Sequence, residues 1–288
     1  MIKISVIIPT FNSEKYIVPC VEAIVDQRRK DIEIIIVDNG SKDNTLALIA
    51  QHCSQAVLIK NNYNSGACKA RNQGIEIASG DWVLSLDCDC VLSNDFFSVF
   101  DTFCLNLSAD IGLVQPKVLQ QDRKKIYSAG ISLSFLRRFY DIGYNQPDCA
   151  KFQIPRNVFG ACSAASLLRR QMLNEVVDDF GYFDERFFFL VEDVDLSWRA
   201  GKKGWKTLFR PELVCYHYGN SSGHHKKTRQ FLSFRNRFYT IKKNEGMLKY
   251  SGKALPLLCY DFPRMIYLFM TNPYMFMGDA RLLREGFR

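Results

Sequence analysis

The residues Trp82-Val-Leu-Ser-Leu86 are followed at once by Asp87-Cys-Asp89, so an apolar run ends in two acids that are separated by one residue. A short apolar run of this kind, bounded by polar residues, predicts a buried β-strand. Its continuous apolar character is typical of a parallel sheet that is covered on both faces. This stretch therefore predicts a strand whose carboxyl end presents two carboxylates.

Similar apolar runs occur earlier in the chain, and each is followed by a segment with helical spacing of its apolar residues. The expected strands span residues 3–8, 33–37, 56–59 and 82–86. The expected helices span residues 13–27, 42–52 (with Ser41 as its N-cap) and 67–78. Alternation of this kind predicts an α/β fold, with a Rossmann-like, mostly parallel sheet flanked by helices.

Polar side chains follow three of these strands where the strands end. In open α/β sheets, ligands bind outside the carboxyl ends of the strands. Asp, Asn and Gly are also ordinary turn formers, so each cluster taken alone has a second explanation. Three clusters at one edge predict a functional rim, with the candidate residues Thr10, Asn12, Asp38, Asn39, Asp87 and Asp89.

Two further segments carry candidate chemistry. Glu192 and Asp193 follow the aromatic run 187–191, and an acid beside an apolar wall has the raised pKa that a general base needs. The same acids are also favoured at a helix N-terminus by the helix dipole, and the residues alone do not decide between the two roles. His217 follows an apolar run and is either a metal ligand or a core histidine.

Together these pieces resemble the family 2 glycosyltransferases with the GT-A fold, specifically their rhamnosyltransferase-like branch. The matching segments occur in the family's order over roughly residues 1–225: 6–12, 36–41, 64–74, 80–89, 160–161, 181–185, 189–196 and 217–221. Two details depart from the commonest pattern. Phe11 stands where Tyr is frequent, and Asp87-Cys-Asp89 stands where this branch often has Asn-Pro-Asp.

The resemblance implies a role for each matching position. The implied nucleotide-sugar site consists of Thr10, Asn12, Asp38, Asn39, Arg71 and Asp87. Asp89 and His217 are implied to bind Mg²⁺ or Mn²⁺ together with the donor diphosphate. Asp193 is implied to be the general base, with Glu192 beside it.

The implied reaction is an inverting transfer from a dTDP-, UDP- or GDP-linked sugar to a glycan or polyprenyl-linked acceptor, in cell-surface polysaccharide synthesis. A metal-dependent nucleotidyltransferase and a non-catalytic nucleotide-sugar-binding protein are the alternatives. A dinucleotide-binding dehydrogenase is disfavoured, because Pro9-Thr-Phe-Asn-Ser13 lacks the glycines that such a site needs after its first strand.

The positive charge is concentrated near the C-terminus. Between His224 and Lys253 there are nine Lys or Arg and one acid, which matches the net charge of +8 of the whole chain. We therefore expect a GT-A domain over residues 1–224 and a basic, apolar helical extension over 225–288. A nucleic-acid site is disfavoured, since no nucleic-acid motif accompanies these cations.

The expected location is the cytoplasmic face of the membrane. The first apolar run is too short for a signal peptide, and the ten cysteines contain no C-x-x-C pair, which favours reduced thiols. The uncharged run over residues 265–278 is shorter than the roughly 20 residues of a spanning helix. Cations beside this run predict peripheral association with an anionic membrane surface, and a solvated helix face is the alternative.

Overall fold

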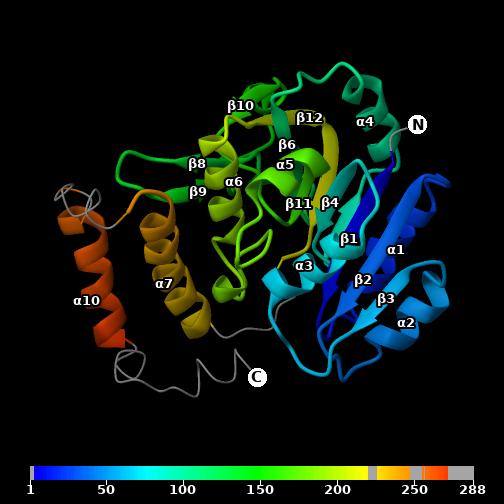
Figure 1. Cartoon of the computed structure of the whole chain (residues 1–288), viewed down its shortest axis with the longest axis horizontal. Helices are drawn as coiled ribbons and strands as arrows, with labels where there is room; N and C mark the ends of the chain where they lie inside the picture. The colour runs from blue at the N-terminus through cyan, green and yellow to red at the C-terminus, as the bar shows by residue number, and fades with distance from the viewer. Residues whose placement is uncertain (1–2, 220–225, 247–254, 256, 272–288) are drawn as a thin grey trace.

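A ten-stranded sheet forms the centre of the protein (Figure 1), for which a computed structural model describes residues 3–219, 226–246, 255 and 257–271. Its main path runs β10-β12-β6-β11-β4-β1-β2-β3, with β5 and β7 paired to β12 and β6. These strands are β1 (Ile4–Thr10), β2 (Ile32–Asp38), β3 (Val57–Lys60), β4 (Trp82–Leu86), β5 (Cys90–Leu92), β6 (Ile111–Gln120), β7 (Ile126–Ser128), β10 (Arg156–Val158), β11 (Ala165–Arg169) and β12 (Lys206–His217). A separate two-stranded sheet pairs β8 (Ile131–Leu133) with β9 (Phe139–Asp141).

Helices cover both faces of the main sheet. Apolar side chains of α1 (Ile17–Val25), α2 (Thr45–His52) and α4 (Phe96–Cys104) pack in the core on one face. Those of α3 (Ala67–Ile77), α5 (Arg170–Val176) and α6 (Glu192–Lys202) pack on the other face. The predicted α/β architecture is therefore confirmed.

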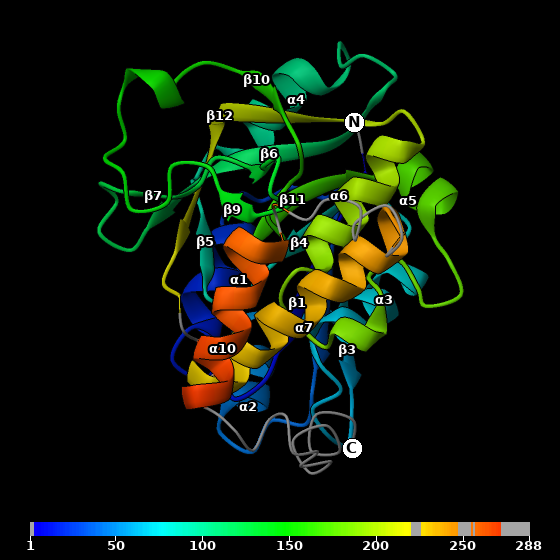
Figure 2. The ribbon, with the colours of Figure 1, turned by 90° about the vertical axis from the view of Figure 1, so that its left-hand side faces the viewer.

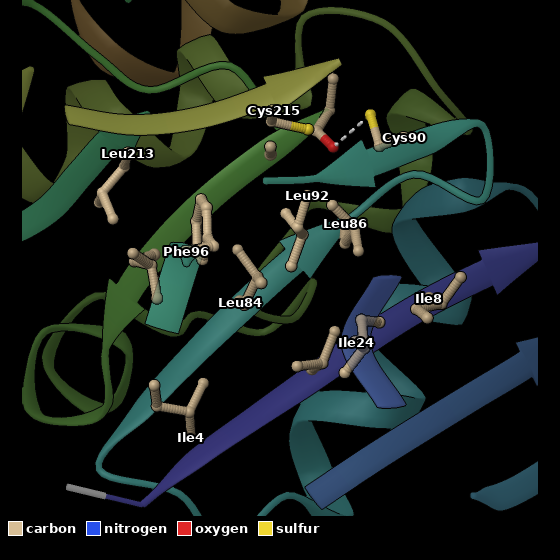
Figure 3. Packing of buried hydrophobic residues seen from close by; sticks show 14 of the residues in the cluster. Ile4, Ile8, Ile24, Leu84, Leu86, Cys90, Leu92, Phe96, Leu213 and Cys215 are labelled. Atoms are coloured by element: carbon tan, nitrogen blue, oxygen red, sulfur yellow. Dashed lines mark hydrogen bonds between the residues drawn. The ribbon is translucent and has the colours of Figure 1, made fainter. Parts of the chain in front are cut away.

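The two cores explain why the strands read as continuous apolar runs. Successive side chains of a strand point to opposite faces of the sheet. In β1, Ile4, Val6 and Ile8 enter one core and Ile7 enters the other. Figure 3 shows Ile4 and Ile8 with Leu84 and Leu86 in the first of these cores. A strand that is buried on both faces has no solvent-exposed side, so its sequence does not alternate between apolar and polar residues.

The four predicted strands are present, and β1 to β4 pair in parallel as expected. Beyond β4 the sheet is mixed, because β11 lies antiparallel between β4 and β6. The prediction that Ser41 caps the second helix is wrong. Helix α2 begins at Thr45, and the Ser41 hydroxyl instead donates to the Asp38 carboxylate, which is a charged and therefore stronger acceptor.

The described part of the C-terminal segment is helical, as predicted. It comprises α7 (Lys226–Asn244), a π-helical turn η3 (Leu257–Asp261) and α10 (Phe262–Thr271). Figures 1 and 2 both place α7 between α6 and α10. Among the described residues, no helix has both the length and the hydropathy to span a membrane. The remainder of the apolar run, residues 272–278, lies outside the described residues, as do Lys249 and Lys253.

Several cations of the basic segment point into the fold. Arg237 forms a buried ion pair with Asp261, with Nε and Oδ1 2.7 Å apart, and so ties α7 to the residues preceding α10. Lys243 forms ion pairs with three carboxylates at 2.8 to 3.0 Å, those of Asp178, Asp184 and Asp195. Part of the local positive charge therefore balances acids of the protein itself.

Candidate functional site

A cavity of about 340 Å³ opens at the carboxyl ends of β1 and β4, where the topology of the sheet predicts a ligand site. Its size lies within the usual range for small-molecule sites. Eight of the ten candidate residues line it: Thr10, Asn39, Arg71, Asp87, Asp89, Glu192, Asp193 and His217. The structure thus brings together residues as far apart in the chain as Thr10 and His217.

The other two candidates, Asn12 and Asp38, lie beside the cavity and are not among its lining residues. The Asn12 Oδ1 atom accepts from the Lys42 backbone at 2.8 Å, so it joins the loop after β1 to the loop after β2. The Asp38 carboxylate accepts from the Thr10 and Ser41 hydroxyls at 3.0 and 2.5 Å. Both residues therefore shape the rim through contacts within the protein, and their contact with a nucleotide stays a prediction.

Arg71 connects the two acidic motifs. From helix α3 its buried guanidinium reaches Asp87 at 2.6 Å and Glu192 at 3.0 Å, while its Nε donates to the Ser85 hydroxyl at 3.0 Å. Burial alone would lower the pKa of Arg71, but the charges of Asp87 and Glu192 outweigh this effect and raise it. The cation is therefore permanent, and it sets the relative positions of a strand end and a helix start.

Asp89 and His217 lie against each other on adjacent segments. Strand β12 pairs with β5, and this places His217 opposite Cys90; the His217 Nε2 atom is 3.2 Å from the Asp89 Oδ1 atom. Burial opposes protonation of His217, but the hydrogen bond and charge of Asp89 outweigh it and raise the pKa of His217. The Tyr127 ring packs edge-on against the imidazole, with ring centroids 4.1 Å apart.

This pair fits a divalent cation. One carboxylate oxygen and one imidazole nitrogen at 3.2 Å match two neighbouring ligands in an octahedral shell with bonds of about 2.1 Å. The Cys90 sulfur is also nearby, but the thiol donates to the Ala164 carbonyl at 3.2 Å and is a poor ligand for hard cations. Asp89 and His217 are therefore the residues that could hold Mg²⁺ or Mn²⁺.

Asp193 also lines the cavity and lies in the first turn of α6. Its two carboxylate oxygens accept from the backbone of Ser163 at 3.2 Å and of Val194 at 2.8 Å. Burial, followed by the negative charges of Glu192 and Asp141, raises the pKa of Asp193 to about 8. A carboxylate with that pKa suits proton abstraction near neutral pH. The helix-terminal position and the base-like environment that the sequence left as alternatives thus occur together.

Four further residues of the cavity were missed by the sequence argument: Tyr127, Asp141, Ser163 and Arg229. Ser163 donates from its hydroxyl to Glu192 at 3.2 Å. Burial raises the pKa of Asp141, although side-chain hydrogen bonds from Ser128 and Cys162 oppose the shift. Three of these residues come from the region between β6 and β11, where no periodic pattern was available to orient them. Arg229 comes from α7, so the C-terminal segment also contributes to the cavity.

The segment just before Glu192 has an unusual backbone. Phe188, Leu190 and Val191 all have positive φ angles, 68°, 70° and 74°, although none is glycine. Such angles are sparsely populated by bulky side chains, above all by β-branched ones. All three residues line the cavity. Strained backbone of this kind gathers at functional sites, because only surrounding structure can hold it in place.

Comparisons with known proteins find glycosyltransferases among the relatives of this chain. The amylovoran biosynthesis glycosyltransferase AmsB of Erwinia amylovora is 26% identical and aligns over 94% of this chain and 92% of its own length. Glycosyltransferase GlyG of Streptococcus pneumoniae is 36% identical over 112 residues, which make up 38% of this chain. The aligned part spans only 37% of GlyG, well under two thirds of that protein.

The crystal structure of GalNAc-T7 with UDP, GalNAc and Mn²⁺ superposes with a TM-score of 0.63 at 14% sequence identity, over 84% of this chain and 48% of that one. At this identity the likeness shows the fold alone, and it confirms the GT-A fold that the sequence predicts. The sequence profile described as "Glycosyl transferase family 2" matches residues 5–177, more than half of the chain. This protein therefore belongs to glycosyl transferase family 2.

Proposed function

We propose that this protein transfers a sugar from a nucleotide-sugar donor to a hydroxyl group of a glycan or polyprenyl-linked acceptor, with inversion of the anomeric carbon. One observation carries the proposal. The same cavity holds the Asp89–His217 pair, suited to a cation and a diphosphate, and Asp193, suited to remove a proton. The UDP and Mn²⁺ in the structure of GalNAc-T7, which shares the fold, support a nucleotide-sugar donor and a divalent cation.

In this reaction Asp193 and the Asp89–His217 pair have different tasks. Asp193 takes the proton of the acceptor hydroxyl, the acceptor oxygen forms a bond to the anomeric carbon, and the bond to the donor diphosphate breaks on the opposite face. Asp89 and His217 would hold a Mg²⁺ or Mn²⁺ ion, which would supply Lewis-acid stabilisation to the departing diphosphate. Glu192 keeps Arg71 and Ser163 in place beside the base. General-base assistance typically contributes about 10²–10⁴-fold to the rate.

The acceptor belongs, in this proposal, to cell-surface polysaccharide synthesis. The name of AmsB, which aligns over nearly its whole length, refers to the synthesis of amylovoran. The donor is a dTDP-, UDP- or GDP-linked sugar, and the three classes stay open.

The test is a panel of dTDP-, UDP- and GDP-sugars with Mg²⁺, with Mn²⁺ and with excess chelator, in which released products are identified. We expect one donor class to release a nucleoside diphosphate in a metal-dependent reaction. A nucleotidyltransferase would instead produce or consume inorganic diphosphate. A non-catalytic protein would be stabilised against thermal unfolding by a donor and release nothing, and either result would overturn the proposal.

We also propose that α10 lies on an anionic membrane surface. Its apolar side chains Phe262, Met265, Ile266, Phe269 and Met270 are between 40% and 76% exposed. An apolar helix face of this kind beside cations binds the interfacial region of a bilayer. The inward-facing Arg237 and Lys243 contribute little to this attraction, so the exposed apolar face has to supply most of it.

Sedimentation with anionic vesicles tests this second proposal. Phe269→Ser together with Met270→Ser should reduce the fraction that sediments. Leu105→Ser is the matched control, because Leu105 is 82% exposed after α4 and lies away from α10. Equal sedimentation of the two variants, or none for the unaltered protein, would exclude α10 as the contact. Point changes are preferable to truncation, since α7 contacts the loop before Glu192.

A further inference from the structure

The loop of residues 187–191 includes a tight and rare turn. The Phe189 backbone N–H donates to the Phe187 carbonyl at 2.8 Å, and Phe188 between them has φ 68° and ψ −62°. These are the features of the strained form of the γ-turn. Leu190 and Val191 follow with positive φ, and Val191 is the residue that precedes α6. The path of this loop therefore decides where the first turn of α6, with Glu192 and Asp193, lies.

One side chain from α7 binds this loop at three points. Asn236 is fully buried, and its Nδ2 atom donates to the carbonyls of Phe187, Phe189 and Leu190 at 3.0, 3.0 and 2.8 Å. An amide nitrogen carries two hydrogens, so at least one of them is shared between two carbonyls. These carbonyls belong to residues within and around the left-handed positions. The amide thus supplies a donor to the Phe189 and Leu190 carbonyls, and it adds one to the Phe187 carbonyl, which also accepts within the turn.

The orientation of the Asn236 amide is determined by its neighbour. The Arg235 Nε atom donates to the Asn236 Oδ1 atom at 3.0 Å, while an Arg235 terminal nitrogen donates to the carbonyls of Arg186 and Phe187 at 2.9 and 3.1 Å. The amide oxygen therefore faces a donor, and the amide nitrogen faces only acceptors. A flipped amide would place oxygen against three carbonyls, so only one orientation is compatible with the loop.

We infer that Asn236 is a positioning residue for the transfer reaction: it holds loop 187–191 in the conformation that directs Glu192 and Asp193 toward Arg71 and Ser163. This inference rests on the proposed function for its catalytic part. The contacts of Glu192 with Arg71 and Ser163, and of Asp193 with the Ser163 backbone, all depend on the start of α6. A base displaced by about 1 Å can cost roughly 10²-fold in rate.

The matched control is Asn244, a second buried asparagine on the same helix. Its Nδ2 atom donates to Asp195 at 2.7 Å and to the Thr240 carbonyl at 3.1 Å, and neither group belongs to the loop. Asn236→Ala and Asn244→Ala remove the same group and should lower the melting temperature to a similar extent. Asn236→Asp retains the shape of the side chain but replaces the donor by a carboxylate that faces carbonyls.

The experiment measures three quantities for each variant: the melting temperature, kcat with the donor KM, and hydrogen exchange of peptides that cover residues 187–191. We expect Asn236→Ala and Asn236→Asp to lower kcat by roughly 10²-fold with little change in the donor KM, and to speed exchange in the loop. Asn244→Ala should retain most of the kcat. Hydrogen exchange of its loop should stay as slow as in the unaltered protein.

Two results would overturn the inference. One is unchanged exchange of the loop in Asn236→Ala. The other is faster exchange with a kcat equal to that of Asn244→Ala at the same folded fraction. If the unaltered protein transfers no sugar from any donor, the proposed function fails. Exchange of the loop in the full chain still decides whether Asn236 holds it.

Discussion

The cavity has two walls that solve the same backbone problem in different ways. The strand-end wall, formed where β1, β2 and β4 end and where α3 begins, has Gly66 at a positive φ angle, and Gly40 and Asn12 have positive φ in the loops beside it. These are the residue types that adopt such angles at low cost. The loop wall, formed by residues 188–193, places Phe188, Leu190 and Val191 there. The strand-end wall is therefore encoded locally, whereas the loop wall depends on contacts from distant parts of the chain.

The two walls meet at Gly66. A β-carbon at this position would come within 2.5 Å of the Phe188 ring and 2.7 Å of the Phe188 carbonyl. The Cys68 backbone N–H also donates to that carbonyl at 3.2 Å. Absence of a side chain at Gly66 thus lets the start of α3 support the strained turn. The walls also differ electrostatically. Asp87 faces Arg71 and Asp89 faces His217, while the donors that reach Asp193 from the described part of the chain are the backbone N–H groups of Ser163 and Val194.

The largest expected effect is a loss of kcat without a loss of nucleotide binding, because the loop wall and the strand-end wall have different functions. Asp193→Asn should lower kcat by about 10²–10⁴-fold, because the amide cannot accept the acceptor proton. Binding of nucleoside diphosphate, measured by calorimetry, should be nearly unchanged, because that task belongs to the strand-end wall. A variant with near-normal turnover and the same product linkage would show that Asp193 is not the base.

The second effect concerns the strand-end wall. Asp89→Asn should weaken the metal-dependent part of nucleoside diphosphate binding by at least about tenfold, since a charged ligand is lost from the cation site. His217→Ala should act in the same direction. Titration of Mn²⁺ at constant nucleotide measures the change. Metal dependence identical to that of the unaltered protein would exclude this pair as the cation site.

The dependence of kcat/KM on pH tests the electrostatic difference between the two walls. The base must be ionised, so kcat/KM should rise with pH through an apparent pKa near 8. After burial, the negative charge of Glu192 is the largest cause of the raised Asp193 pKa. Glu192→Gln removes this charge, so the rise of kcat/KM should move to lower pH. Asp141→Asn should move it in the same direction by less. A profile that stays in place in both variants would argue against Asp193 as the titrating group.

The smallest effect is on stability. The pKa of Asp193 is raised in the fold, so its contribution to stability is fully present below pH 4 and is lost as the pH rises toward 8. Asp193→Asn should therefore increase the free energy of unfolding at pH 8 by about 1–2 kcal/mol, a figure reduced from full linkage because the side chain is only half-buried. Denaturant unfolding at pH 5 and pH 8 measures the difference, which should be smaller at pH 5. A variant less stable than the parent at pH 8 would contradict this.

Many features of this protein can be predicted from its sequence because they depend on residues close together in the chain. Apolar runs identify the strands β1 to β4, since burial on both faces leaves only apolar residues along them. The topological rule for parallel sheets then places Thr10, Asn39, Asp87 and Asp89 at one edge. The helical spacing after Glu192 identifies α6 and puts two acids in its first turn.

Tertiary structure alone decided which groups face each other, because hydrogen-bond partners that are distant in the chain produce no periodic pattern in the sequence. It directed Asp38 toward Thr10 and Ser41 and placed Arg71 between two acidic motifs. It also turned Lys243, which looks like a surface cation in the sequence, toward three buried or half-buried carboxylates. The left-handed loop before Glu192 is the clearest case. No local preference of Phe, Leu or Val favours that backbone. Its carbonyls are bound by groups distant in the sequence, Cys68 in α3 and Asn236 in α7.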